Sequence, residues 1–144
     1  MIYQTIKLLT DDVLEFHEKL TQEYGNLTGI RDYGLLELSI AAPFQSAFEQ
    51  EAYETIFDKA AKLAVGIIKN HPFIDGNKRT GIHAMFVLLY INNILLNLSQ
   101  KDIENLAIDI ADNKIDEKEL SKKLKSHANI NHTSNLLVTF EIEP

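Results

Sequence analysis

The sequence contains no cysteine and no tryptophan, and it has only three prolines among 144 residues. Without cysteine the chain has neither disulfides nor a thiolate nucleophile, which fits a reducing cytoplasm. No apolar stretch of signal-peptide length opens the chain, and no run reaches the roughly 18 apolar residues of a membrane-spanning helix. We therefore expect a cytoplasmic protein without a membrane partner.

Positive charge is also scarce, because 14 basic residues face 21 acidic ones and the formal net charge is −7. Binding along nucleic acid needs clustered lysine and arginine to neutralise phosphates, so we expect no nucleic-acid partner. The densest basic run, Lys122-Lys123-Lys125, follows an acidic stretch in one predicted helix, which indicates a solvated helix face. The length predicts a single domain, residues 1–144, that buries a core without metals or disulfides.

Apolar periodicity predicts six helices and no alternation of strands with helices, which indicates an all-α fold, a compact bundle. Thr10 is the expected N-cap of the first helix, Gly25 its end, and Pro43 the end of the second. The expected helices cover residues 11–24, 35–42, 56–68, 77–91 and 100–110, and the sixth starts at a capping box at 116–119. The fourth is apolar on nearly every side, so we expect it in the middle of the bundle.

Three segments outside the helices have their own patterns. Between Pro43 and Ala52 the periodicity is lost, which predicts a loop or short hairpin; we interpret its aromatics, Phe44 and Phe48, as partly buried core residues. Strict alternation at Leu136, Val138, Phe140 and Ile142 predicts a strand in the extension 131–144, and residues 2–8 give a weaker strand signal. We expect these two strands to pair as a ribbon, or the C-terminal one to dock on another chain.

Residues 71–80, His-Pro-Phe-Ile-Asp-Gly-Asn-Lys-Arg-Thr, form a polar loop between two apolar helices. Backbone N–H groups at the start of the following helix have no partner within it, and Gly76 lets an anion approach them, which predicts a phosphate cradle. Lys78 and Arg79 add positive charge that suits phosphate oxygens. As ordinary first-turn residues they would oppose the helix dipole, which favours the binding role.

The remaining side chains of this loop supply chemistry. Asp75 would repel a polyphosphate unless it held a Mg²⁺ ion between carboxylate and phosphate, although it could also simply cap the helix. His71 is suited to take a proton from an attacking hydroxyl, whereas a lone histidine at a helix end is more often structural. Phe73 is expected to anchor the loop in the core. His17, His83, His127 and His132 lack metal-ligand spacing.

This decapeptide closely resembles the signature loop of the Fic/Doc family, and its Asn-Lys-Arg-Thr ending resembles the Doc (death-on-curing) toxin branch. Residues 29–32, Leu35-Leu36-Glu37 and the Ala60-Ala61 helix are also family-like, so the resemblance covers roughly residues 10–126. It implies a compact helical protein that modifies a protein hydroxyl with a nucleoside triphosphate such as ATP. By position, the resemblance implies these roles: His71 as base, Asp75 as Mg²⁺ ligand, and Gly76, Asn77 and Arg79 as phosphate-binding residues.

Lys78 distinguishes the branches of the family. Adenylylating Fic enzymes have glycine at this position and a second arginine at the position of Ile82, whereas the lysine of Doc is associated with transfer of the terminal phosphate. Gly76, however, is the Fic residue where Doc has alanine, so the loop is a hybrid. We favour a kinase-like transferase; adenylylation is the alternative, and a non-catalytic nucleotide-dependent binding module is a third interpretation.

The resemblance also bears on partners. Fic proteins with a built-in inhibitory helix have Ser or Thr four residues before a Glu that is followed by Gly or Asn; here Gln100 precedes Glu104-Asn105. A separate antitoxin protein is therefore expected. The segment 44–52, with Phe44 and Phe48, lies where the family has a flap that holds a target protein by strand addition, for example a component of the translation machinery.

Overall fold

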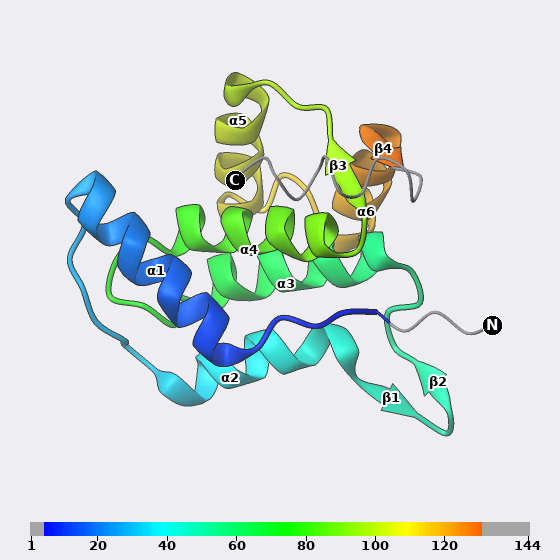
Figure 1. Cartoon of the computed structure of the whole chain (residues 1–144), viewed down its shortest axis with the longest axis horizontal. Helices are drawn as coiled ribbons and strands as arrows, with labels where there is room; N and C mark the ends of the chain where they lie inside the picture. The colour runs from blue at the N-terminus through cyan, green and yellow to red at the C-terminus, as the bar shows by residue number, and fades with distance from the viewer. Residues whose placement is uncertain (1–4, 131–144) are drawn as a thin grey trace.

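The structure, a computed structural model, describes residues 5–130 and confirms an all-α fold. These residues form six α-helices and two small antiparallel strand pairs, whose arrangement is drawn in Figure 1. The elements are α1 (Thr10–Tyr24), α2 (Tyr33–Ala41), the 3₁₀ turn η1 (Ala42–Phe44), β1 (Ser46–Ala47), β2 (Gln50–Glu51), α3 (Ile56–Asn70), α4 (Asn77–Ile91), β3 (Ile94–Leu96), α5 (Gln100–Ala111), α6 (Glu117–Ser126) and β4 (Ala128–Ile130).

Side-chain caps set most helix boundaries. At the start of α3, the N–H of Asp58 donates to Thr55 Oγ1 at 3.0 Å, while the N–H of Thr55 donates to Asp58 Oδ2 at 3.3 Å. The same reciprocal capping box starts α5 and α6. Gly25 ends α1 in the left-handed region at φ 71°, as predicted.

The predicted N-cap of α1 is wrong by one residue. Thr10 already lies inside the helix, and Leu9 is the N-cap. The reason is Asp12, whose Oδ2 accepts the N–H of Leu9 at 2.9 Å, so an acidic side chain in the first turn satisfies the N–H that precedes the helix.

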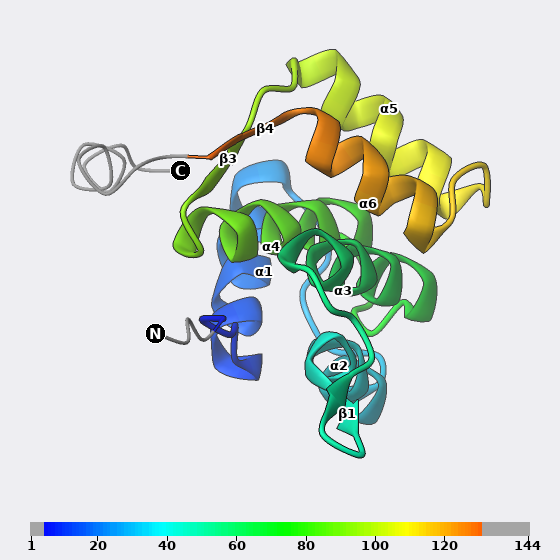
Figure 2. The same ribbon diagram turned by 90° about the vertical axis from the view of Figure 1, so that its right-hand side faces the viewer.

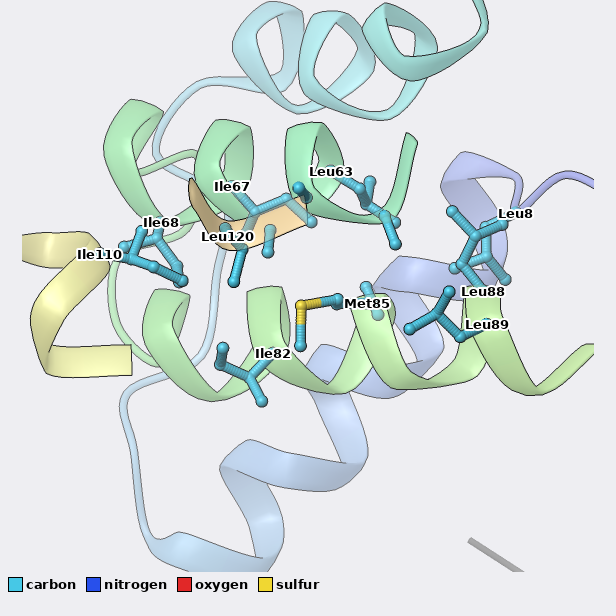
Figure 3. Close-up of a cluster of buried hydrophobic side chains, with 14 of the residues drawn as sticks. Leu8, Leu63, Ile67, Ile68, Ile82, Met85, Leu88, Leu89, Ile110 and Leu120 are labelled. Carbon is cyan, nitrogen blue, oxygen red and sulfur yellow. The ribbon is translucent and has the colours of Figure 1, made fainter. Parts of the chain in front are cut away.

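The antiparallel pair α3 and α4 forms the centre of the molecule (Figures 1 and 2). Figure 3 shows Leu63 and Ile67 of α3 and Met85 and Leu88 of α4 in the layer between these helices, and all four side chains are fully buried. Gly81 permits the close approach, because an added Cβ would lie 2.8 Å from Ile68 Cγ1. These contacts hold the short loop 71–76 between two rigid helices.

The predicted central place of α4 is confirmed, although part of its surface is left unpacked. Helix α3 contacts α2, α4, α5 and α6, and α4 contacts α1, α3 and α5, so both helices lie in the middle of the bundle. One side of α4 packs on α3, but its other side, with His83, Phe86, Val87 and Tyr90, is only half-buried and lines a cavity. One apolar side of α4 therefore packs in the core and another lines the cavity, and hydrophobic periodicity does not distinguish the two.

The segment after Pro43 is a hairpin, β1 paired antiparallel with β2. Phe44 packs against the core, but the side chain of Phe48 is 100% exposed at the tip, so the core assignment of Phe48 is wrong. Its φ of 54° turns the chain there and directs the ring outward. At the hairpin base, the ammonium of Lys59, 1% exposed, donates to the carbonyl of Tyr53 and pairs with Glu51 at 3.3 Å.

A second strand pair was not predicted. β3 follows α4 and pairs antiparallel with β4, which follows α6. Three residues per strand are too few to show alternation. The predicted terminal ribbon is not testable as a whole, because residues 2–4 of the first strand and the whole extension 131–144 lie outside the described residues; residues 5–9 form no strand.

The exposed surface of α6 and the lengths of the helices bear on two predictions from the sequence. Lys122, Lys123 and Lys125 are exposed on α6, as predicted for a solvated face. Between residues 5 and 130, none of the helices combines the length and the apolar character needed to cross a membrane.

Candidate active site

The loop between α3 and α4 begins at His71, which caps the C-terminus of α3 in the left-handed region at φ 50° and ψ 55°. This conformation costs a non-glycine residue energy unless neighbours fix it. Arg31 supplies two such contacts: its Nε donates to the His71 carbonyl at 2.5 Å, and its Nη2 donates to the Asn70 carbonyl at 2.6 Å. The imidazole of His71 is thereby exposed beside the cavity.

The backbone of residues 29–32 also pairs with the loop. The N–H groups of Arg31 and Asp32 both donate to the Pro72 carbonyl, at 2.7 and 3.0 Å, and the N–H of Ile74 donates to the Gly29 carbonyl at 3.1 Å. Asp32 then caps α2 through the N–H of Leu35 at 3.0 Å. The family-like segment Gly-Ile-Arg-Asp, residues 29–32, is therefore one support of the candidate site.

Phe73 extends from the loop into the protein and is 1% exposed. Its ring stacks on His17 of α1, with centroids 3.8 Å apart and an interplanar angle of 7°. His17 is 5% exposed, and its Nε2 donates to the carbonyl of Asp75 at 2.8 Å, since a carbonyl only accepts. Helix α1 thus holds the loop from behind by a ring contact and a hydrogen bond.

Asn77, the first residue of α4, braces the loop from the inside. Its Oδ1 accepts the N–H of Phe73, and its Nδ2 donates to the Phe73 carbonyl, both at 3.0 Å. Its Nδ2 also lies 3.2 Å from Nδ1 of His71. The side chain is 5% exposed and is directed at the loop, so its contribution to the cavity is its backbone N–H.

Asp75 accepts three hydrogen bonds through its carboxylate. Leu27 N–H and Asn26 Nδ2 donate to Oδ2 at 3.2 and 3.1 Å, and Gly76 N–H donates to Oδ1 at 2.9 Å. The N–H of Leu27, followed by those of Gly76 and Asn26, lowers the pKa of Asp75 below its ordinary value, and the nearby Arg79 adds to this. The group is therefore a carboxylate throughout the neutral range.

The two cations of the loop differ in their surroundings. Lys78 is exposed. The guanidinium of Arg79 lies over the ring of Tyr24, 4.0 Å from its centroid, and donates to Asn26 Oδ1 at 3.3 Å. Gly76, at φ 79°, starts α4, and an added Cβ would be strained in this conformation.

These groups meet at one end of a cavity of about 1100 Å³. His71, Asp75, Gly76, Lys78 and Arg79 line the polar end. The other end is largely apolar and is formed by α4, β3 and α5; its residues include Phe86, Val87, Leu96, Ile103 and Ile108. Phe44 and Phe48 do not line the cavity and belong to a separate surface.

The oxygen ligands at the polar end of the cavity match those of a divalent cation. No group of three or more His, Cys, Asp or Glu side chains converges among residues 5–130. Asp75 Oδ1 accepts one hydrogen bond and keeps lone-pair capacity. One carboxylate together with substrate phosphates and water is the usual set for Mg²⁺, so the residues fit this ion.

Several supporting residues were missed by the sequence prediction. His17 was given no role at the loop, and its signal is a polar ring on the apolar face of α1. The contacts of Tyr24 and Asn26 with the loop gave no signal, because 45 or more residues separate them from it. Arg31 was noted only as part of the family-like segment 29–32.

The fold and the site define the class of this protein. It is a helical domain that presents a histidine, a carboxylate and two cations around the N-terminus of a buried helix. The model of the Fic/DOC family matches residues 7–89, more than half of the chain, and the chain therefore belongs to the Fic/Doc family. It is also similar to the Toxin Doc of Mycolicibacterium smegmatis, with 40% identity over 73 residues. That alignment covers 51% of this chain and 56% of the relative, so it spans about half of either protein.

Proposed function

We propose that this protein is a Doc-like toxin that transfers the terminal phosphate of a Mg²⁺-bound nucleoside triphosphate, ATP being the expected one, to a hydroxyl of a target protein. The observation that carries the proposal is the convergence of His71, Asp75, Arg79 and the N-terminus of α4 on one end of the cavity. The family membership supports a protein-modifying transferase, and the name of the mycobacterial relative supports the toxin assignment.

The start of α4 supplies the phosphate site. The N–H groups of Asn77, Lys78 and Arg79 occupy the first helical turn, where no earlier carbonyl of the helix can accept them. They point toward the loop with the positive end of the helix dipole. Lys78 and Arg79 add two charges, and Gly76 adopts the left-handed conformation, φ 79°, from which the helix begins.

Asp75 would hold the Mg²⁺ ion, whose role when bound is to neutralise phosphate charge and so favour attack at phosphorus. The lowered pKa of Asp75, caused first by the N–H of Leu27, keeps the carboxylate charged for this purpose. In the reaction, the target oxygen bonds to the terminal phosphorus, the bond from that phosphorus to the bridging oxygen breaks, and the nucleoside diphosphate leaves. His71 takes the hydroxyl proton.

The contact with Asn77 adds a condition on His71. An amide nitrogen only donates, so Asn77 Nδ2 engages the lone pair of His71 Nδ1 and places the proton of the neutral ring on Nε2. A base needs a lone pair on the nitrogen that faces the substrate. Nδ1 can take the hydroxyl proton once the contact with Asn77 opens, and Nε2 can take it once the ring proton has moved to Nδ1, an exchange that water permits because His71 is exposed.

Lys78 favours phosphotransfer over adenylylation. Lys78 stands in the first turn of α4, where a glycine would leave room for the chain of phosphates to continue toward the helix. A charged side chain there favours a nucleotide whose terminal phosphate faces His71. Adenylylation is the second candidate, because Gly76 provides the open approach that accompanies transfer of the nucleotide.

The other parts of the molecule provide surfaces for two protein partners. The β1–β2 hairpin carries the fully exposed Phe48 and has free strand edges, which suits docking of a target protein by strand addition. The apolar end of the cavity suits an amphipathic segment of a separate antitoxin, whose binding there would cover the phosphate site as well.

The test is transfer of radioactive label to protein in a cell lysate supplied with Mg²⁺ and ATP labelled at the α or the γ phosphate. Label from γ alone supports the kinase-like reaction, and label from α supports adenylylation. His71→Ala should reduce transfer by about 10²- to 10⁴-fold. His127→Ala, a histidine outside the cavity lining, is the matched control. If no label depends on His71, both transferase assignments are wrong and a binding module remains.

A further inference from the structure

The segment that follows α1 forms a wall of the phosphate site opposite α4. Asn26, half-buried in this wall, uses both ends of one amide. Its Nδ2 donates to Asp75 Oδ2 at 3.1 Å, and its Oδ1 accepts from Arg79 Nη1 at 3.3 Å. A single planar group therefore contacts the metal-binding carboxylate and the phosphate-binding cation.

The contact with Asp75 is part of a larger arrangement. Leu27 N–H, the next donor along the chain, binds the same oxygen at 3.2 Å, and Gly76 N–H binds Oδ1 at 2.9 Å. Asn26 and Leu27 thus use the two lone-pair directions of Oδ2. The remaining lone-pair capacity of Asp75 lies at Oδ1, so the amide of Asn26 decides which oxygen is left for a cation.

The contact with Arg79 has a similar effect on the cation. The guanidinium is held between Asn26 Oδ1 and the Tyr24 ring, which lies 4.0 Å away. An arginine held on two sides loses less side-chain entropy when phosphate oxygens bind its remaining N–H groups. Arg79 is otherwise exposed, and within the described residues these are the contacts that limit its motion.

We propose that Asn26 is a positioning residue that couples divalent-cation binding at Asp75 to phosphate binding at Arg79. The inference rests on the proposed function, since it assigns the regulation of that same site. A shift of Asp75 toward a cation moves the amide that also holds Arg79, so each ligand favours the geometry that the other needs. Such coupling is reciprocal by thermodynamic linkage.

The amide suits this role because it donates at one end and accepts at the other. Asn26→Leu has a similar volume and lacks both functions, and Asn26→Ala removes the group entirely. Asn26 is half-buried in a loop, so neither variant opens a core cavity. Asn105→Ala, an exposed asparagine of α5, is the matched control.

The experiment measures the affinity for a non-hydrolysable ATP analogue by calorimetry, with Mg²⁺ and with EDTA. In the wild type, Mg²⁺ should raise the affinity, and in Asn26→Leu this gain should fall about fivefold or more. In an Asp75→Asn background, Asn26→Leu should have no further effect on the gain, since the two groups act as a unit. If Asn26→Leu has the melting temperature of the wild type, its smaller gain in affinity is caused by lost positioning and not by loss of the fold.

A second measurement does not need a nucleotide. The ¹⁵N relaxation of Arg79 Nε in the free protein should report faster motion in Asn26→Leu and in Tyr24→Leu, and no change in Asn105→Ala. If Asn26→Leu weakens binding equally with Mg²⁺ and with EDTA, or leaves Arg79 Nε unchanged, the coupling is refuted. If the wild type binds no nucleotide under either condition, the proposed function fails and takes this inference with it.

Discussion

At the scale of single residues, each unusual group of the loop is held by a partner from elsewhere in the chain. His71 has a left-handed conformation that Arg31 fixes through the carbonyls of residues 70 and 71. Phe73 is held by His17, and Asp75 by the backbone and side chain of residues 26–27. The energy cost of the strained loop is therefore offset by contacts with α1 and the segment after it.

His17 makes two contacts with the loop, a ring contact with Phe73 and a hydrogen bond to the carbonyl of Asp75, and substitutions can remove each one separately. His17→Phe keeps a ring against Phe73 but leaves the Asp75 carbonyl without its donor, whereas His17→Gln has an amide nitrogen in place of Nε2 and no ring. We expect His17→Phe to raise KM for Mg²⁺–ATP about fivefold, because the loss of one hydrogen bond, worth about 1 kcal/mol, releases Asp75 from its position. His17→Gln should keep KM closer to the wild type and lower the melting temperature instead. The opposite order would show that the ring contact positions Asp75.

His83 gives a prediction for the pH dependence of stability. Burial lowers the pKa of His83 below 6.5, although Glu23 opposes the shift, and its ring makes an edge contact with Phe16 at 4.9 Å. The unfolded chain then binds a proton more readily than the folded one, so stability falls as the pH drops from about 6.5 toward the lowered pKa. His83→Phe should lose less stability than the wild type between pH 7.5 and 5 in urea titrations. His127→Gln is the control, and an identical pH profile for His83→Phe would contradict the assignment.

At the scale of elements, the sequence predicted what depends on neighbours along the chain. The capping box at 116–119, Gly25 and Pro43 mark helix ends through contacts within four residues, and these predictions are confirmed, whereas Thr10 was one residue off. The β3–β4 pair joins segments more than 30 residues apart, and its short strands gave no periodic signal. The exposure of Phe48 also depends on three-dimensional context, since an aromatic side chain alone favours burial.

The α3–α4 contact leads to a prediction at Gly81. An added Cβ would lie 2.8 Å from Ile68 Cγ1 and 3.2 Å from the backbone oxygen of Ala64, and a carbonyl cannot move without the helix. Gly81→Ala should therefore lower the free energy of unfolding by about 1–3 kcal/mol, although alanine by itself favours a helix. Gly34→Ala, also in a helix but with its nearest contact at 3.4 Å, should be neutral or slightly stabilising. Equal effects of both variants in chemical denaturation would exclude close packing as the cause.

At the scale of the whole molecule, the candidate site is assembled from segments that are distant in sequence. The decapeptide 71–80 was identifiable because its residues are contiguous and chemically unusual. Its supports at 17, 24–27 and 31 were not, since contacts across 40 to 58 residues leave no local pattern. The cavity likewise depends on the distance between α4 and α5, which periodicity does not determine. The side chains of the candidate site were thus identifiable from one loop, and the contacts that position them were not.

Helix α6 is joined to α3 by a hydrogen bond whose contribution to stability depends on pH. Ser121 of α6 donates to Asp58 Oδ1 of α3 at 2.6 Å, and this bond is the main cause that lowers the pKa of Asp58 below 3.8. A lowered carboxyl pKa adds stability that is present above pH 3.8 and is lost as the pH falls through the folded-state pKa.

Ser121→Ala should consequently lower the free energy of unfolding by about 1–2 kcal/mol at pH 7, toward the low end for a bond to a charged group because Asp58 is partly solvated. The difference from the wild type should shrink as the pH falls below 3.8 toward 3, because protonation of Asp58 removes the charged acceptor. Ser126→Ala is the control, since that hydroxyl donates to a carbonyl of its own helix at 2.8 Å and should show no pH-dependent difference. Denaturant titrations at both pH values measure the effect. An equal loss at pH 7 and pH 3 would mean that Ser121 stabilises α6 by packing, and that the charge of Asp58 does not hold the two helices together.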